Sequence, residues 1–373
     1  MSCSCPQVDW PEPIVRVQSI SDSGSPVIPD RYIKPPLERP SKLGLARTSI
    51  TSTNDQDVLN IPLIDLGGLL IQDEDNLILP DSILNQICMA CQNWGFFQIV
   101  NHGVSPDLLH RVREVWREFF HLPYEHKQVY ANSPKTYEGY GSRLGVEKGA
   151  ILDWSDYFYL HYLPQCLKDP NKWPALPTSC REVVDEYCCQ LVKLSKNLLK
   201  ILSITLGLGE SYLENAFGGE EIGACMRVNF YPKCPQPDLT LGLSSHSDPG
   251  GMTLLLPDNQ VVGLQVRKDD NWVTVKPAPN AFIVNIGDQV QVLSNAIYKS
   301  VEHRVVVNSV EERVSLAFFF NPRGDLPLQP AKELVTSDRP ALYLPMTFNE
   351  YRLYIRTQGP RGKVYMESLK SPR

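Results

Sequence analysis

From residue 225 onward, apolar and polar positions alternate with a period of about two, which is typical of half-buried β-strands. The alternating runs are separated by turn residues such as Pro249-Gly250-Gly251 and Asp269-Asp270-Asn271. They predict eight strands, at residues 225–231, 241–246, 252–256, 263–268, 272–275, 281–285, 303–308 and 312–320. Eight short strands joined by turns favour a double-sheet jelly roll, also called a double-stranded β-helix.

Before residue 225 the apolar positions mostly follow helical spacing. Ser105-Pro106-Asp107 is a typical helix start, and Gly207 is a typical helix end. The predicted helices cover residues 81–94, 108–120, 178–206 and 287–294, and helical spacing returns at 347–357. Further strands are expected at 61–66, 94–104 and 154–162, whereas 137–141 is interpreted as a turn. The predicted fold class is therefore α+β, with a jelly-roll core flanked by helices.

The same patterns divide the chain into four expected regions. Residues 1–57 are rich in Pro and Ser and are interpreted as an N-terminal extension and linker. Residues 58–220 should form a mainly helical region packed on the core, and residues 221–330 the jelly roll itself. Residues 331–373 are expected to form a C-terminal helical segment that covers the pocket.

Composition narrows the class of protein. Apolar residues make up 42% of the 373 positions and charged residues 21%, as in an ordinary globular protein. The net charge of −6 argues against a nucleic-acid partner, which usually requires a basic face. No apolar run reaches the roughly 20 residues of a membrane helix, and no secretory signal opens the chain. We therefore expect a monomeric protein without a membrane partner, in the cytoplasm and with the nucleus as a second location.

The ten cysteines are consistent with a reducing compartment. Cys88 and Cys91 have the spacing of a redox pair, but they lie on one apolar face of a predicted helix. Packing in the core is the interpretation we favour for both thiols.

A candidate metal site is found at His246 and Asp248. Residues two apart on an extended backbone place their side chains on the same face. Alone, a His-x-Asp pair is common and would fit a surface loop or a core histidine. His303 adds a second imidazole after enough chain for several intervening strands. Two His and one carboxylate, with other coordination positions open, form the ligand set of non-haem Fe(II) oxygenases.

A third element follows His303 by ten positions. Arg313 and Ser315 share one strand face, and a guanidinium beside a hydroxyl binds a carboxylate well. The ordered set His-x-Asp, His, Arg-x-Ser resembles the 2-oxoglutarate and Fe(II)-dependent dioxygenases. Three further segments also resemble that family, namely Ile61–Leu66, Trp94–Gly103 and Asn229–Pro232.

This resemblance implies a set of roles. His246, Asp248 and His303 would hold Fe(II), while Arg313 and Ser315 would bind the distal carboxylate of 2-oxoglutarate. Asn229 and Tyr231 share a strand face and would reach the same cosubstrate, although a core position is the other interpretation of Tyr231. The family consumes O2, releases succinate and CO2 and hydroxylates a C–H bond, and ascorbate is expected to support turnover.

The substrate anchors are inferred from charge. Arg227 lies on the face of Asn229 and Tyr231, and a buried arginine is costly unless it is paired. Phe348, Arg352 and Arg356 form one stripe of the C-terminal helix. For these two arginines alone, a solvated face with remote salt bridges is the simpler interpretation. Together with Arg227 they favour a clamp for a substrate carboxylate.

An aromatic wall completes the expected pocket. Phe319 continues the face of Arg313 and Ser315, and it would lie near Tyr159 and Phe348. The predicted substrate is a small carboxylic acid with a hydrocarbon body.

The N-terminal segments Trp10–Ser19 and Ile28–Pro35 resemble the plant jasmonate-induced oxygenases, and the similarity spans essentially the whole chain. This resemblance implies hydroxylation of jasmonic acid at carbon 12, a catabolic step that lowers active jasmonate and restrains defence signalling. It assigns the carboxylate to Arg227, Arg352 and Arg356. It implies that the aromatic residues Tyr159, Phe319 and Phe348 contact the ring and the pentenyl chain of jasmonic acid. At position 159 the family more often has Phe.

Two alternatives stay open at this point. A flavonoid-type dioxygenase would oxidise a neutral flavanone or leucoanthocyanidin, which does not need three cations. A hormone-binding protein without turnover would not need the intact His246, Asp248 and His303.

Overall fold

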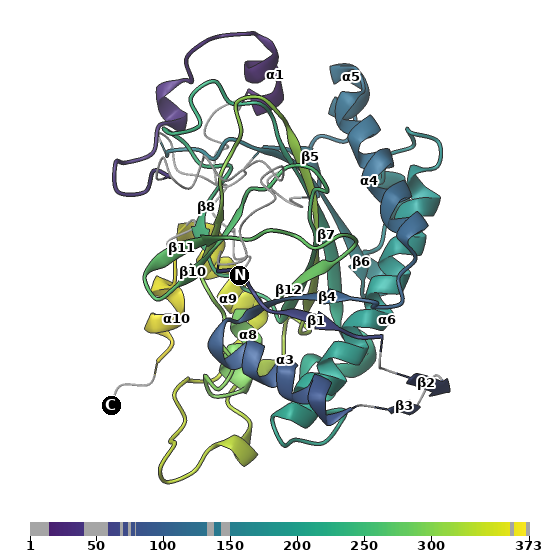
Figure 1. Ribbon diagram of the computed structural model, residues 1–373, viewed down its shortest axis with the longest axis vertical. Coiled ribbons are helices and arrows are strands. Elements are labelled where there is room, and N and C mark those ends of the chain that lie inside the picture. The colour runs from purple at the N-terminus through teal and green to yellow at the C-terminus, as the bar shows by residue number, and fades with distance from the viewer. Residues whose placement is uncertain are drawn as a thin grey trace, which may run out of the picture.

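The computed structural model describes residues 15–40, 59–67, 70–73, 76–78, 80–132, 138–142, 150–358 and 362–370 (Figure 1). Its largest sheet has eight strands, in the order β1 (Leu63–Asp65), β4 (Phe96–Val100), β12 (Phe282–Ile286), β9 (Met252–Leu256), β14 (Arg313–Asn321), β7 (Gly223–Tyr231), β6 (Asp156–Leu163) and β5 (Gly139–Gly141). A second sheet has four strands, in the order β11 (Asn271–Thr274), β10 (Leu264–Lys268), β13 (His303–Val305) and β8 (Leu243–His246). Two short hairpin-like pairs are β2 (Leu70–Asp73) with β3 (Asn76–Ile78), and β15 (Pro327–Leu328) with β16 (Met346–Thr347).

The two large sheets form the predicted jelly roll, and each of the eight strands expected after residue 225 is present. β13 is shorter than expected, since it ends at Val305, and its pairing with β8 shifts register between His303 and Val305. The prediction of a turn at 137–141 is wrong, since Gly139–Gly141 pairs with β6 as an edge strand. Gly139 is needed there for close packing, because a Cβ atom would lie 2.2 Å from the carbonyl oxygen of Tyr130.

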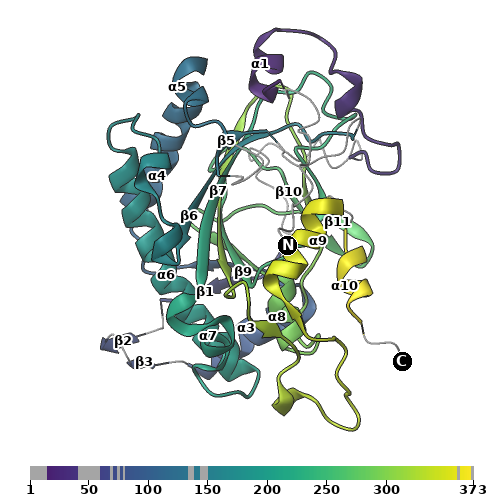
Figure 2. The same ribbon diagram turned by 180° about the vertical axis from the view of Figure 1, so that it is seen from behind.

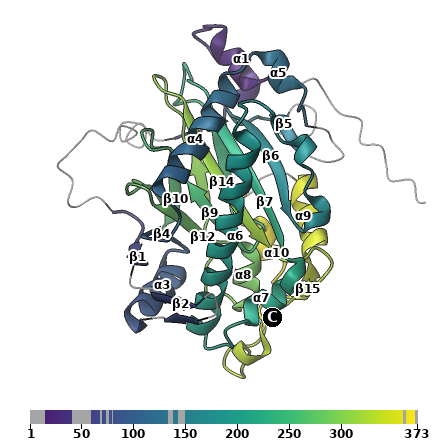
Figure 3. The same cartoon turned by 90° about the vertical axis from the view of Figure 1, so that its right-hand side faces the viewer.

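Helices cover the outer face of the large sheet. Figure 3 shows α4 (Pro106–His121) and α6 (Cys180–Thr205) lying across it, and α3 (Asp81–Asn93) packs beside β4. Ser105 caps α4 by accepting from the Asp107 N–H at 3.2 Å, as its sequence predicts. The remaining helices are α1 (Val17–Asp22), α5 (Tyr124–Gln128), α7 (Tyr212–Phe217), α8 (Asp288–Leu293), α9 (Phe348–Gln358) and α10 (Val364–Ser368). Within the described ranges, no helix has the length and apolar character to cross a membrane.

The strands β7 and β14 separate an apolar face from a polar one. Met226, Val228 and Phe230 of β7 belong to the main core cluster beneath the helices, and Phe230 stacks on Phe120 of α4 at 4.7 Å. The alternate residues face the second sheet, where Tyr231 packs in a cluster with strands β8 and β13. Burial of the apolar face stabilises the sheet and leaves the inner face available for polar side chains.

The described part of the N-terminal extension, residues 15–40, is anchored on the core through Lys34. The Lys34 ammonium donates to Asp153 at 2.7 Å and to the Ser244 hydroxyl at 3.0 Å, and all three side chains are buried. Ser244 also donates to Asp153 at 2.5 Å. Because Ser244 belongs to β8, the extension is tied to the strand that carries His246.

Replacing Lys34 with Met should destabilise the fold by about 3–5 kcal/mol, because it breaks a buried ion pair and removes the Lys34 ammonium from the Asp153 carboxylate. Urea denaturation followed by circular dichroism measures the change. The double variant Lys34→Met/Asp153→Asn is the control and should recover a large part of the loss, since it also removes the buried negative charge that Lys34 balances. A loss below about 1 kcal/mol in the single variant would contradict this role, because that is the scale of an exposed ion pair.

Candidate active site

Three potential metal ligands converge between β8 and β13. His246 ends β8, His303 begins β13, and the two residues are direct cross-strand partners. Asp248 follows β8, and its Oδ1 lies 3.6 Å from Nε2 of His246 and 3.7 Å from Nε2 of His303. Ligand atoms of all three residues lie within 4.8 Å of one another. The structure therefore brings together the three residues that the sequence predicts, in a geometry that suits one metal ion.

Both imidazoles are oriented by backbone carbonyls. Nδ1 of His246 lies 2.8 Å from the Ser244 carbonyl oxygen, and Nδ1 of His303 lies 3.3 Å from that of Val301. Since a carbonyl only accepts, each Nδ1 carries the proton and each Nε2 presents its lone pair. Burial, together with the neighbouring His246, lowers the pKa of His303 to about 4, so this ring is neutral at physiological pH.

Asp248 is held by two side chains that the sequence analysis missed. Its Oδ2 accepts from the Thr253 hydroxyl at 2.5 Å and from the Asn285 amide at 2.7 Å, which leaves Oδ1 for a metal. Burial alone would raise the pKa of Asp248, but the two histidines and the Thr253 hydroxyl hold it well below the usual range. The available signal was a single polar residue inside each of two apolar strands, β9 and β12.

Arg313 and Ser315 lie on β14 opposite Tyr231 and Asn229 of β7, so these four predicted residues share one inner face. Nη1 of Arg313 donates to the Ser315 hydroxyl at 3.2 Å, and the guanidinium lies 5.2 Å from the centre of the Tyr231 ring. Arg313 is only 3% exposed, and its Nε has no hydrogen-bond partner among the described residues. A buried guanidinium with an unused donor fits a bound carboxylate.

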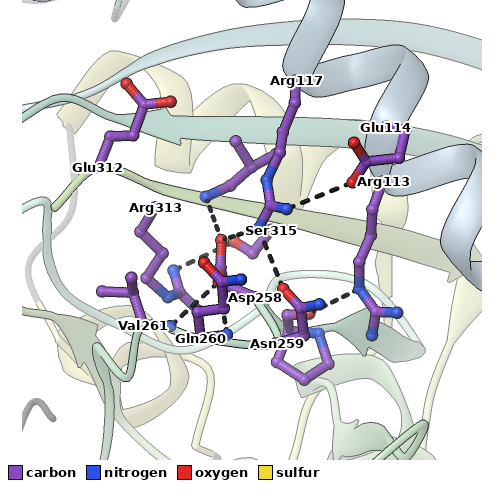
Figure 4. A network of polar contacts seen from close by, with 12 residues as sticks. Arg113, Glu114, Arg117, Asp258, Asn259, Gln260, Val261, Glu312, Arg313 and Ser315 are labelled. Carbon is purple, nitrogen blue, oxygen red and sulfur yellow. Dashed lines mark hydrogen bonds and ion pairs between the residues drawn. The ribbon is translucent and has the colours of Figure 1, made fainter.

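The segment around Arg313 is fixed by Asp258, a residue that the sequence analysis did not single out (Figure 4). Asp258 accepts from the backbone N–H groups of Gln260 and Val261 at 2.8 and 3.0 Å. Its other oxygen accepts from the Val314 N–H at 3.0 Å and from Arg117 at 3.2 Å. Asp258 thus joins the turn after β9, the start of β14 and helix α4, and it holds the backbone next to Arg313.

The predicted substrate residues of the sheet occupy the same inner face. Arg227 lies opposite Tyr159 of β6, and its guanidinium stacks on the Tyr157 ring at 4.3 Å. Its Nε is buried and has no hydrogen-bond partner within the described part of the chain. Phe319 is half-buried on β14, further along the face that carries Arg313.

The other predicted substrate residues lie on α9. Phe348 is buried, and the Arg352 guanidinium lies 5.4 Å from the centre of its ring. Arg356 belongs to the same helix, but its side chain lies outside the described residues. The predicted aromatic and cationic stripe is therefore described at two of its three positions.

Comparison with known proteins decides the family. Residues 61–176 match the N-terminal region of a non-haem dioxygenase in morphine synthesis, and residues 222–322 match the 2OG-Fe(II) oxygenase superfamily. Jasmonate-induced oxygenase 2 of Arabidopsis thaliana is 62% identical over 98% of this chain and 95% of its own length. The chain belongs to the 2OG-Fe(II) oxygenases. Flavanone 3-dioxygenase 2 of Oryza sativa subsp. japonica is more distant, at 39% identity over 90% of this chain and 92% of its own length.

The similarity of this 2OG-Fe(II) oxygenase extends to solved structures. The crystal structure of JOX2 in complex with 2OG, Fe and JA superposes with a TM-score of 0.87 at 61% identity, covering 97% of this chain and 99% of that one. The predicted fold, the enzyme class and the use of Fe(II) and 2-oxoglutarate (2OG) are confirmed. The donor set of two imidazoles and one carboxylate oxygen fits Fe(II).

Replacing Thr253 with Val should weaken Fe(II) binding by about 10-fold, because Asp248 loses a hydrogen bond that orients its carboxylate. Calorimetric titration under anaerobic conditions measures the dissociation constant. The matched control is Thr336→Val, which makes the same change at an exposed position. Equal affinities in the two variants would show that the Thr253 hydroxyl does not tune the ligand.

Proposed function

We propose that this 2OG-Fe(II) oxygenase hydroxylates jasmonic acid at carbon 12 and forms 12-hydroxyjasmonate. In the plant this reaction is a catabolic step that lowers active jasmonate and restrains defence signalling. The observation that carries the proposal is the likeness, over 97% of the chain, to JOX2 in complex with 2OG, Fe and JA. The flavonoid-type alternative has weaker support, since the flavanone dioxygenase shares only 39% identity.

Each group of residues has a defined task. His246, Asp248 and His303 hold Fe(II), which together with 2OG supplies the oxidising chemistry that places one oxygen atom from O2 in a C–H bond. Arg313 and Ser315 bind the distal carboxylate of 2OG, and Arg313 has a buried donor to spare. Asn229 and Tyr231, directly opposite on β7, line the other side of that cosubstrate.

The substrate carboxylate is bound by Arg227 together with Arg352 and Arg356. Arg227 is held by its stacking on Tyr157, and its unpartnered Nε can donate to an anion. The hydrocarbon part of the substrate packs against aromatic rings, namely Tyr159, Phe319 and Phe348. These rings exclude water from the C–H bond that reacts.

We also propose that the protein is a monomer and that it works in the cytoplasm, with a second pool in the nucleus. The free thiols of the described chain suit a reducing compartment, and one chain supplies every proposed site residue. Light scattering after gel filtration and imaging of a tagged protein test these two points.

Product analysis tests the reaction. Purified protein is mixed anaerobically with Fe(II), 2OG, ascorbate and jasmonic acid, and is then exposed to ¹⁸O2. We expect jasmonic acid to gain one labelled oxygen at carbon 12 in an amount equal to the succinate formed, and a flavanone to remain unchanged. Succinate without oxidised jasmonate would refute the substrate and leave the oxygenase class intact.

Replacing Arg227 with Met should lower kcat/KM for jasmonic acid by about 10–100-fold, the effect of losing a hydrogen bond between charged groups. Methyl jasmonate lacks the negative charge, so the preference for acid over ester should shrink by the same factor. The control is Arg323→Met, which removes an arginine that pairs with Asp325 at the surface. An unchanged preference in Arg227→Met would contradict the carboxylate role.

A further inference from the structure

Asp288, the first residue of α8, is a buried carboxylate that the assigned chemistry does not use. It is 1% exposed and accepts three hydroxyl hydrogen bonds. The donors are Tyr351 at 2.6 Å, Ser300 at 2.7 Å and Ser247 at 3.2 Å. A buried carboxylate is stable only with such partners, so these four side chains are held in fixed positions relative to one another.

Two of the donors lie next to metal ligands. Ser247 stands between His246 and Asp248 in the sequence, and Ser300 precedes His303 by three residues. The backbone makes a third link, because the Asp288 N–H donates to the Asp248 carbonyl at 2.8 Å. Asp288 therefore contacts both segments that carry the metal ligands.

The remaining donor comes from the C-terminal segment. Tyr351 lies on α9 directly before Arg352, and Figure 2 shows α9 beside α8. A second set of contacts also joins the C-terminal segment to the segment before His303 through α8. The side-chain amide oxygen of Gln291 accepts from the Ser300 N–H at 2.8 Å and from the Lys363 ammonium at 2.9 Å. The helix that carries a proposed substrate arginine is thus joined to the backbone of the metal site.

We propose that Asp288 is a positioning residue through which α9, by its Tyr351 hydroxyl, aligns the segments that carry His246, Asp248 and His303. When α9 packs in the position seen here, the Tyr351 hydroxyl donates a third hydrogen bond to the Asp288 carboxylate, which then holds Ser247 and Ser300 in place. When α9 moves away, Asp288 loses one of three donors in a buried place, and the two ligand segments gain freedom. Substrate held by Arg352 keeps α9 seated, so 2OG consumption stays coupled to hydroxylation. The coupling rests on the proposed function, whereas the alignment of the ligands does not.

One conservative substitution isolates the role of the Tyr351 hydroxyl. The Tyr351 ring is 1% exposed and packs in a cluster with Val292, Tyr343 and Met366. Tyr351→Phe keeps that packing and removes only the hydroxyl. Tyr354→Phe is the matched control, because it makes the same change on the same helix at a residue that is 42% exposed.

The first readout is Fe(II) affinity, measured by anaerobic calorimetry on the full-length variants without substrate. We expect Tyr351→Phe and Asp288→Asn each to weaken Fe(II) binding by about 10-fold, and Tyr354→Phe to leave it unchanged. The double variant Tyr351→Phe/Asp288→Asn should be no weaker than Asp288→Asn alone, because both changes break the same link. An unchanged affinity in Tyr351→Phe, or additive losses in the double variant, would overturn the alignment. If Asp288→Asn does not fold, the comparison of the two tyrosine variants decides the question.

The second readout is the ratio of succinate to hydroxylated jasmonate. We expect the two products in equal amounts in the wild type and in Tyr354→Phe, and an excess of succinate in Tyr351→Phe. Arg352→Ala should raise KM for jasmonic acid and leave the Fe(II) affinity unchanged. Equal amounts in Tyr351→Phe would overturn the coupling. If the wild type does not oxidise jasmonic acid, the proposed function fails, and the Fe(II) titration still tests the role of Asp288.

Discussion

The site depends on one cross-strand contact, the pairing of β8 with β13 that sets His303 opposite His246. Directly opposite residues of an antiparallel pair place their side chains on one face, close enough to share a ligand. This register fixes two of the three metal ligands. The third, Asp248, follows from the turn after β8, whose backbone is bonded to the start of α8. A shift of one residue would turn one imidazole away from the metal.

Side chains alternate between the two faces of a strand, and this alternation explains how the large sheet carries charged side chains on its inner face. On β7 and β14 one set of side chains is apolar and packs beneath α4 and α6, and its burial favours the fold. The other set holds Arg227 and Arg313, whose desolvation opposes the fold. Each guanidinium is partly compensated by an aromatic face, Tyr157 or Tyr231. Binding of anionic ligands would supply the rest of the compensation, which links affinity for acids to the stability of the inner face.

The features predicted correctly from the sequence are those that depend on the alternation of residues along a single strand. The spacing of His246 and Asp248, the face shared by Arg313 and Ser315, and the eight strands after residue 225 all follow from alternation. The sequence did not predict contacts whose partners are set by the tertiary fold. Asn285 donates to Asp248 across 37 positions, and the local sequence around either residue does not indicate the other as its partner. The prediction of a turn at Gly139 was wrong for a similar reason, because a glycine required by a neighbouring backbone has the same local sequence signal as a turn glycine.

Among the described strands, β8 lies at the edge of its sheet beside β13, and its outer side forms an isolated bridge between His246 and Gly362. An edge strand without such contacts would be free to fray next to a metal ligand. Segments before and after the core contact this strand. Lys34 holds the Ser244 hydroxyl from the N-terminal side, and the Gly362 N–H donates to the Ser245 carbonyl at 3.3 Å from the C-terminal side. Both residues lie outside the segments 61–176 and 222–322 that define the family. Because the jelly roll leaves its ligand-bearing strand at the edge, the rigidity of the metal site depends on the parts of the chain that the shared core does not contain.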